Sequence, residues 1–253
     1  MTDDLSTEAL SALGARPVRA YPATLSTETM AMAWAREGAA AGSVVVADYQ
    51  ASPRGRGGLP WVVTAGAGLG FTLLLRPDLP PDREGWPYVA ALLGLHDVVG
   101  GALVWPDTVT DAGGAVRASL GVYVELGPGR TEWVTVNVLV EDARPPRAGL
   151  LRDVVAAIEA RVEQEPEQVL AAYLPLCTTI GQQRRARLIP MGPGGPEVSG
   201  QAVGVLADGA LVLLTAKGSR VAVPPHNLGL LEEPAAPAEP PEQLFGQRPG
   251  RRC

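Results

Sequence analysis

Two apolar runs flank a loop of glycine, proline and arginine in the stretch from residue 42 to residue 77. The runs at 44–46 and 71–77 predict two buried strands. The loop between them carries Arg54 and Arg56. A guanidinium group binds carboxylate or phosphate through paired hydrogen bonds, and binding residues are often presented on loops held by a rigid scaffold. The stretch therefore predicts a site for an anionic ligand between two strands.

Helical and strand patterns are mixed along the rest of the central part. Apolar spacing predicts helices over 30–42, with Gly38 or Gly42 as the stop, over 88–96 and over 150–174, the last divided in two near Pro166. A short strand is expected at 103–107, and residues 116–126 and 132–140 predict an antiparallel hairpin around the turn GPGR. Residues 1–20 read as a lead-in with one short capped helix. The pattern indicates an α+β fold whose helices cover one face of a sheet.

The composition changes at Thr178. From there to residue 231, short apolar runs are separated by the turn sequences MGPGGP, ADG and AKG, which is typical of a small five-stranded barrel. The final proline-rich residues hold too little apolar surface to become ordered. We therefore expect a catalytic-type domain over 1–177, a small β domain over 178–232 and a disordered tail over 233–253.

The charge and hydropathy of the chain exclude two classes of partner. The formal net charge is -6 and the pI is about 5.1, whereas proteins that bind nucleic acid normally carry a basic surface. No apolar run approaches the roughly 20 residues of a membrane-spanning helix, and the acidic N-terminus differs from a signal peptide. We expect a cytoplasmic protein that binds neither nucleic acid nor membrane.

Cysteine, histidine and lysine are scarce. The two cysteines, Cys177 and Cys253, offer no disulfide framework, and His96 and His226 stand far apart without acidic or cysteine neighbours. A zinc site or a histidine-based triad is not expected, and we predict no metal site. Among 21 basic residues the only lysine is Lys217, so no residue before it can do the chemistry of a lysine.

In order and spacing, several motifs resemble the biotin protein ligases within the biotin and lipoate ligase superfamily. They are Ser26-Thr27 ahead of a helix, the strand GSVVVADYQ, the loop Arg54-Gly55-Arg56, Trp61 and the strand GLGFTLLLRP. Trp105-Pro106 resembles the middle of the family's Lys-Trp-Pro-Asn-Asp element, and GVYVEL resembles the strand after its catalytic lysine. The run CTTIGQQRRARLI is similar to the start of the family's C-terminal domain. The likeness extends over roughly residues 20 to 231.

The resemblance implies a fold, a reaction and partners. The fold would be a mixed β-sheet backed by helices, of the class II synthetase-like biotin ligase type, followed by a small SH3-like β-barrel and without the N-terminal DNA-binding domain of repressor-type members. The reaction would join biotin and ATP, with Mg²⁺, into biotinyl-adenylate, which a lysine of a biotin carboxyl carrier domain then attacks. Biotin cannot be separated from lipoate or octanoate by sequence, and the oligomeric state stays open, with a dimer as one alternative.

The resemblance also implies site residues. Ser26 and Thr27 would meet biotin, Gln50 would lie along the bound acid, and Trp61 would help to cover the ligand. The ligand-binding set is completed by Arg54, Gly55, Arg56 and Trp105, and Arg56 would carry catalytic charge. Two structural alternatives remain: Ser26 and Thr27 as plain helix caps, and the arginine loop as a solvated surface loop.

Three positions that matter for the chemistry depart from the family's pattern. Pro53 replaces a loop glycine, Val104 replaces the lysine before Trp-Pro, and the catalytic lysine falls at Ala118. Arg117, one place earlier, is the candidate substitute, although neighbouring side chains on a strand point to opposite faces. Two functions therefore stay open: an ATP-dependent ligase with weakened activity, and a non-catalytic homologue that binds a biotin-like acid or a carrier protein.

Overall fold

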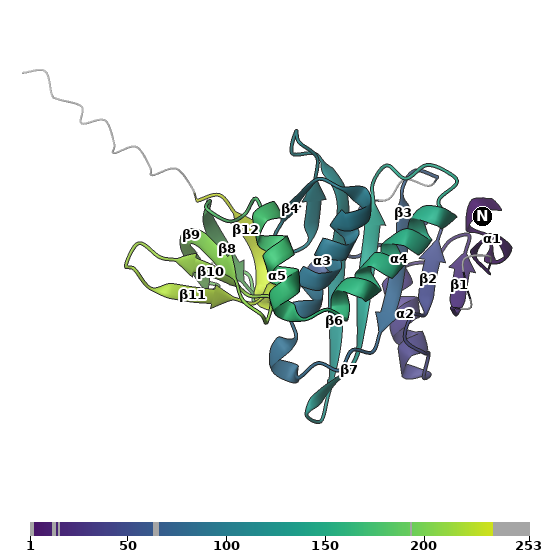
Figure 1. Ribbon diagram of the computed structural model, residues 1–253, viewed down its shortest axis with the longest axis horizontal. Coiled ribbons are helices and arrows are strands. Elements are labelled where there is room, and N and C mark those ends of the chain that lie inside the picture. The colour runs from purple at the N-terminus through teal and green to yellow at the C-terminus, as the bar shows by residue number, and fades with distance from the viewer. Residues whose placement is uncertain (1–2, 12–13, 15, 63–65, 193, 235–253) are drawn as a thin grey trace, which may run out of the picture.

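The computed structural model describes residues 3–11, 14, 16–62, 66–192 and 194–234, and places them in two sheets with packed helices (Figure 1). Most of the predicted C-terminal tail, residues 235–253, lies outside the described residues. Among those described, no helix is both long and apolar enough to cross a membrane.

The larger sheet has seven strands in the order β1-β2-β3-β7-β6-β5-β4. In sequence order they are β1 (Val18–Tyr21), β2 (Val44–Ala47), β3 (Leu69–Leu75), β4 (Ala102–Val104), β5 (Thr108–Thr110), β6 (Val116–Gly127) and β7 (Arg130–Val140). β1 and β2 run parallel, and the other neighbours are antiparallel. The expected mixed sheet and the expected hairpin of β6 and β7 are confirmed.

The helices are α1 (Thr7–Ser11), α2 (Thr27–Arg36), α3 (Trp86–Val99), α4 (Ala148–Val162) and α5 (Pro166–Tyr173). Short 3-10 turns occur at Asp3–Leu5, Arg56–Gly58, Pro81–Arg83, Leu174–Leu176 and Pro225–Asn227. α3 is apolar on all sides and buried over most of its length, because α4, α5 and the sheet surround it. The predicted helices are confirmed, with α4 and α5 separated just before Pro166.

Two different cores lie on the two faces of the sheet. Leu73 and Leu75 of β3 belong to the main core, which also contains the buried residues of α3 and α4. Leu74 between them packs instead with Ala35 of α2 and with Trp133 of β7. Alternation along each strand therefore separates a helix-backed face from a second face that α2 covers only in part. We call the second face the ligand face.

Two local predictions differ from the structure. The strand expected over 103–107 is two strands, because Pro106 has no N–H to continue a ladder and the chain turns between β4 and β5. The lead-in over residues 1–20 contains β1, which pairs with β2 over four residues. Its half-buried residues give no clear alternation from which a strand could be predicted.

The smaller sheet contains five antiparallel strands in the order β11-β10-β9-β8-β12. They are β8 (Gln183–Leu188), β9 (Glu197–Val205), β10 (Leu211–Leu214), β11 (Arg220–Val223) and β12 (Leu228–Glu232). The five strands agree with the expected SH3-like domain, but the described sheet is not closed into a barrel. β11 and β12 are the two edges of the described sheet, and Pro224 and Pro225, which lack N–H donors, separate them.

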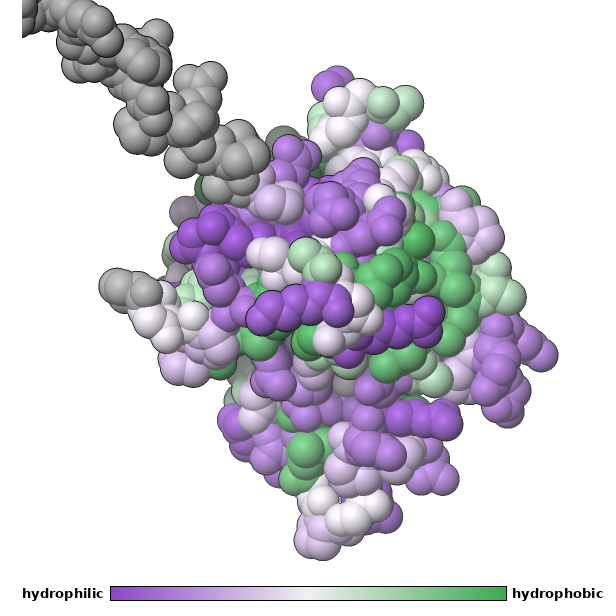
Figure 2. All heavy atoms as spheres, turned by 90° about the vertical axis from the view of Figure 1, so that its left-hand side faces the viewer, coloured by the Kyte–Doolittle hydropathy of each residue, from purple (hydrophilic) through white to green (hydrophobic). Residues whose placement is uncertain are grey.

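The two sheets share one main core. Ala186 and Leu211 of the smaller sheet belong to the same buried cluster as Leu103 of β4. Figure 2 views the molecule from the side of the smaller sheet and shows a continuous hydrophobic area bordered by hydrophilic side chains. The shared core crosses the expected boundary at residue 178 and does not separate two domains there. The domain boundary therefore remains a prediction.

Candidate functional site

Polar side chains interrupt the apolar ligand face at the centre of the sheet. Thr72 lies on β3 between residues of the main core, and Asn137 lies opposite it on β7. The hydroxyl of Thr72 is 2.7 Å from Asn137 Oδ1 and 2.8 Å from Thr27 Oγ1. All three residues are buried. Buried polar groups need partners, so this cluster holds the start of α2 against the sheet.

The start of α2 joins this cluster through Gln50. Thr27 donates its backbone N–H (2.8 Å) and its hydroxyl (3.1 Å) to Gln50 Oε1. Ser26 occupies the N-cap position, but its side chain makes no capping hydrogen bond. Its side chain is only 5% exposed, and its Oγ has no hydrogen-bond partner among the described residues. Plain capping by Ser26 is therefore absent, and a buried hydroxyl is left for another group to satisfy.

The arginine loop, residues 51–61, lies across the ligand face. A Cβ atom at Gly121 of β6 would come within 2.7 Å of the carbonyl carbon of Gly55 and 2.8 Å of the Arg56 nitrogen. A Cβ at Gly55 would collide with the indole of Trp61. Asn137 Nδ2 donates to the Arg54 carbonyl at 3.4 Å. The two glycines thus let loop, strand and indole approach more closely than side chains would permit.

The two loop arginines have different environments. The Arg54 side chain is exposed and donates to the carbonyl of Gly58 at 3.0 Å. The Arg56 side chain is 7% exposed, and its Nε donates to Asp107 Oδ2 at 2.7 Å. Its Nη1 and Nη2 donate to the carbonyls of Leu228 and Gly229 in β12. Arg56 therefore joins the loop to the smaller sheet, whereas Arg54 remains accessible to an anion.

A pocket of about 380 Å³ opens beside the loop. It is lined by Glu28, Met32, Gly55, Gly57, Gly58, Glu84, Tyr88, Val122, Tyr123, Val124 and His226. Burial raises the pKa of the Glu28 carboxyl, while a hydrogen bond from Asn137 and the charge of Arg54 lower it in part. Burial also raises the pKa of Tyr88, whose hydroxyl stays protonated and donates to the Val122 carbonyl at 3.0 Å.

The structure brings together Ser26, Thr27, Gln50, Arg54, Gly55, Arg56 and Trp61 around the loop and the ligand face. Trp105 is separate from them: it is 1% exposed, and its indole donates to the Gly209 carbonyl at 3.0 Å between the two sheets. Its position is that of a core residue joining the sheets.

The lysine positions of the family also fall away from the polar cluster. Ala118 is 0% exposed and belongs to the main core on the helix-backed face. Arg117 is exposed and lines a different groove, together with Val98 and Val99 at the end of α3 and Leu150 of α4. The structure does not place Arg117 beside Gln50 or Arg56.

Four residues of the site were not predicted as functional: Glu28, Thr72, Asp107 and Asn137. A signal existed for two of them: Thr72 is the single polar residue of β3, and Asn137 is an amide within the buried, mostly apolar second half of β7. Nothing in the sequence pairs Asp107 with Arg56, since the pairing depends on the turn after β4. Within the described part of the chain, no three His, Cys, Asp or Glu side chains gather as metal ligands.

Comparisons with known proteins bear on the family and the fold of the chain. No protein-family model matches the chain. A biotin ligase of acetyl-CoA carboxylase from Mycobacterium tuberculosis is 30% identical over 228 residues, which cover 79% of this chain and 84% of the relative. The bifunctional ligase/repressor BirA of Bacillus subtilis is 26% identical over 163 residues, which cover 62% of this chain and 44% of that relative.

The fold is also that of solved biotin protein ligases. The biotin protein ligase of Aquifex aeolicus, determined with biotin and ATP, superposes with a TM-score of 0.63 at 18% identity. The match covers 87% of this chain and 100% of the other. At 18% identity the structural likeness shows the fold alone. The family is shown by the similarity in sequence to the Mycobacterium tuberculosis ligase. Because the Mycobacterium tuberculosis ligase is 30% identical and 84% of it is covered, the chain belongs to the biotin protein ligase family.

Proposed function

We propose that the protein binds biotin on the ligand face and that its ligation chemistry is weak or absent. The observation that carries the proposal is the buried Ser26 hydroxyl, which has no hydrogen-bond partner among the described residues. It precedes Thr27, whose backbone N–H donates to Gln50. A buried polar group without a hydrogen bond costs roughly 1–3 kcal/mol, so a ligand that supplies the partner regains that free energy on binding.

The polar groups around Ser26 suit a ligand with both an amide-like end and an acid end. Thr27, Gln50 and Asn137 present hydroxyl and amide groups in a buried position, where hydrogen bonds discriminate strongly between ligands. Arg54 offers an exposed guanidinium in the loop above them, which is the type of group that binds a carboxylate. Biotin combines a ureido ring with a carboxylate, which matches this arrangement.

The chemical step has less support than binding. Formation of an acyl-adenylate places developing negative charge on oxygen atoms, and the loss of a stabilising donor typically costs on the order of 100-fold in rate. Val104 and Ala118 stand at the family's lysine positions, and Lys217, the single lysine of the chain, lies exposed in the turn between β10 and β11. Since Arg56 is bound to Asp107, Arg54 is the loop cation left for phosphates.

The second candidate function is the ligation itself, and family membership favours it. The Mycobacterium tuberculosis relative is named a ligase, and the Aquifex aeolicus ligase was solved with ATP as well as biotin. In this case ATP with Mg²⁺ would bind beside Arg54, and a biotin carrier domain would be the protein partner. A buried, free Cys177 agrees with the cytoplasm as the compartment, as the sequence predicts.

Calorimetry with biotin, followed by incubation with biotin, ATP and a carrier domain and by mass spectrometry, tests both functions. We expect biotin to bind and the carrier lysine to gain little or no mass. Ser26→Ala should lower the affinity for biotin about fivefold while leaving stability equal or higher, because it removes an unpartnered buried hydroxyl. Ser199→Ala, at an exposed position of β9, is the matched control. Absence of biotin binding in the wild type would refute the proposal, and rapid labelling of the carrier would establish the second function.

A further inference from the structure

Arg147 immediately precedes α4 and is one of the most deeply buried charged residues described, at 1% exposure. Its Nη2 donates to Asp48 Oδ1 at 2.7 Å and to Asp4 Oδ1 at 3.0 Å. Its Nη1 donates to the Gly68 carbonyl at 3.1 Å, and its Nε donates to Asp4 Oδ2 at 3.0 Å. One guanidinium thus bonds to three segments that are distant in the sequence.

Two of these segments are the ends of the stretch that carries the arginine loop. The ladder between β2 and β3 ends at the pair Ala47 and Gly70. Asp48 comes directly after the last paired residue of β2, and Gly68 comes shortly before the first paired residue of β3. Beyond the ladder, Arg147 bonds to both ends. Gln50, which binds Thr27, follows Asp48 by two residues.

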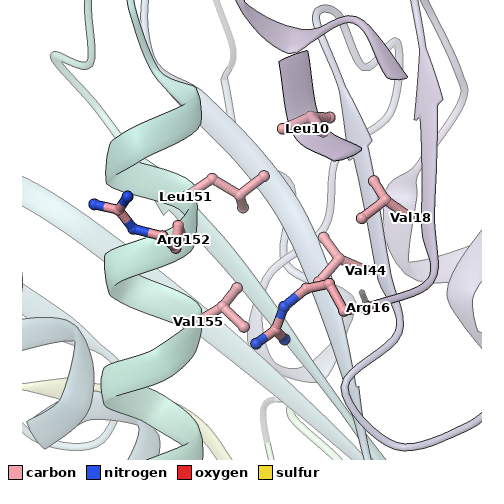
Figure 3. Close-up of a pocket in the computed structure, with 7 residues that line it drawn as sticks. All are labelled: Leu10, Arg16, Val18, Val44, Leu151, Arg152 and Val155. Atoms are coloured by element: carbon pink, nitrogen blue, oxygen red, sulfur yellow. The ribbon is translucent and has the colours of Figure 1, made fainter. Parts of the chain in front are cut away.

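The third segment is the N-terminal turn. Asp4 accepts the backbone N–H of Arg147 at 2.8 Å as well as its side-chain donors, so it fixes both the start of α4 and the direction of the guanidinium. The N-terminal elements also pack on α4: Leu10 and Val18 line one small pocket with Leu151 and Val155 (Figure 3). The N-terminal turn therefore supports Arg147 at the start of α4.

A planar guanidinium is well suited to this position. It presents donors in fixed directions, so that Asp48 and the Gly68 carbonyl are held at one spacing, which a flexible ammonium group would not impose. The hydrogen bonds to Asp4 raise the pKa of Arg147, with a further contribution from Asp48, so the charge persists despite burial. Removal of one member of such a buried network leaves an uncompensated charge.

We propose that Arg147 is a positioning residue for the arginine loop, which sets the spacing of the two loop ends through Asp48 and Gly68 and is itself held by Asp4. The position of Gln50 against α2, and hence the polar cluster of the ligand face, depends on this spacing. The ligand part of the proposal rests on the proposed binding of biotin, whereas the loop part does not. The competing explanation is that the network only stabilises the start of α4.

Hydrogen exchange in the ligand-free protein separates the two explanations. Asp48→Asn removes one charge and keeps the shape of the side chain. We expect peptides within residues 50–61 to exchange about tenfold faster, while those of α4 and the smaller sheet stay unchanged. The control is Asp97→Asn, which breaks the ion pair between Asp97 of α3 and Arg161 of α4 and should leave residues 50–61 unchanged. Faster exchange in α4 and residues 3–11 without any change at 50–61 would overturn the proposal.

Biotin affinity supplies a second readout. Asp48→Asn and Arg147→Lys should each weaken biotin binding about fivefold or more at a temperature where both variants are folded, because the loop end that carries Gln50 is less well fixed. An unchanged affinity in both variants would refute the ligand part. If the wild type itself binds no biotin, the proposed function fails, and the exchange of residues 50–61 still decides whether Arg147 positions the loop.

Discussion

The Nε atom of Arg56 lies 2.7 Å from Oδ2 of Asp107, in an ion pair that joins the arginine loop to the turn after β4. The same guanidinium bonds to two carbonyls at the start of β12. The side chain therefore closes a three-way junction between the loop, the larger sheet and the smaller sheet. An arginine that the resemblance placed among the ligand-binding residues thus donates to the protein itself from each of its three guanidinium nitrogens.

Arg56→Ala should destabilise the protein, because it leaves the Asp107 carboxylate and two carbonyls without their donor. For a pair this buried we expect a loss of about 2–4 kcal/mol in the free energy of unfolding. Urea denaturation measures it. Arg152→Ala, which breaks an exposed ion pair with Asp153, should leave the unfolding midpoint unchanged. Equal midpoints for the two variants would contradict the junction.

Gly121→Ala should displace the arginine loop. The new methyl group would meet the backbone of Gly55 and Arg56, which cannot move aside as a side-chain end can. We expect biotin binding to weaken about tenfold or more, which calorimetry measures, because the loop no longer reaches the ligand face. Gly204→Ala is the matched control, since no atom lies within 4 Å of its added Cβ. A Gly121→Ala variant with full affinity would show that the loop does not cover the ligand.

Restoring a lysine to β6 tests which strand position faces the ligand. Ala118→Lys would place an ammonium group in the main core and should unfold at much lower urea, since an unpaired buried charge is very costly. Ser119 shares the ligand face with Gly121, so Ser119→Lys should keep its stability. We expect adenylate formation from biotin and ATP to rise in Ser119→Lys and not in Ala118→Lys. Mass spectrometry of the products measures it, and the reverse result would refute the assignment of faces.

Much of the fold follows from apolar spacing and turn residues. The helices at α2, α3, α4 and α5 and the β6–β7 hairpin are predicted because each has its own period or turn signal. β1 has neither a hydrophobic period nor a turn signal. It forms a strand because tertiary contacts pair it with β2. The open form of the smaller sheet depends on where two prolines direct β12, which strand patterns do not reveal.

The candidate site was predictable in part. Ser26, Thr27 and Gln50 could be placed by resemblance, and the structure brings them together. The separation of Arg54 from Arg56 was not predictable, because residues two apart in a loop show no sign of which one meets Asp107 and β12. The environment of Ala118 was also not predictable. The resemblance identifies it as the residue at the family's lysine position, but the face of the sheet on which its side chain lies is fixed by the register of β6 against β7.

Glu28 should make the stability of the protein depend on pH. Burial raises the pKa of its carboxyl in the folded state above that in the unfolded chain, so the folded state binds more protons between the two values. This group therefore makes the free energy of unfolding decrease as the pH rises through that window, which begins near the ordinary carboxyl pKa of 4.5. Glu28→Gln should remove this contribution, so that the variant gains stability relative to the wild type as the pH rises.

Urea denaturation at constant ionic strength, from about pH 4 to about pH 7, measures the difference in the free energy of unfolding between Glu28→Gln and the wild type. Glu8→Gln, at an exposed position of α1, serves as the control. A difference between Glu28→Gln and the wild type that is constant with pH would show that the carboxyl is not held in a raised-pKa environment.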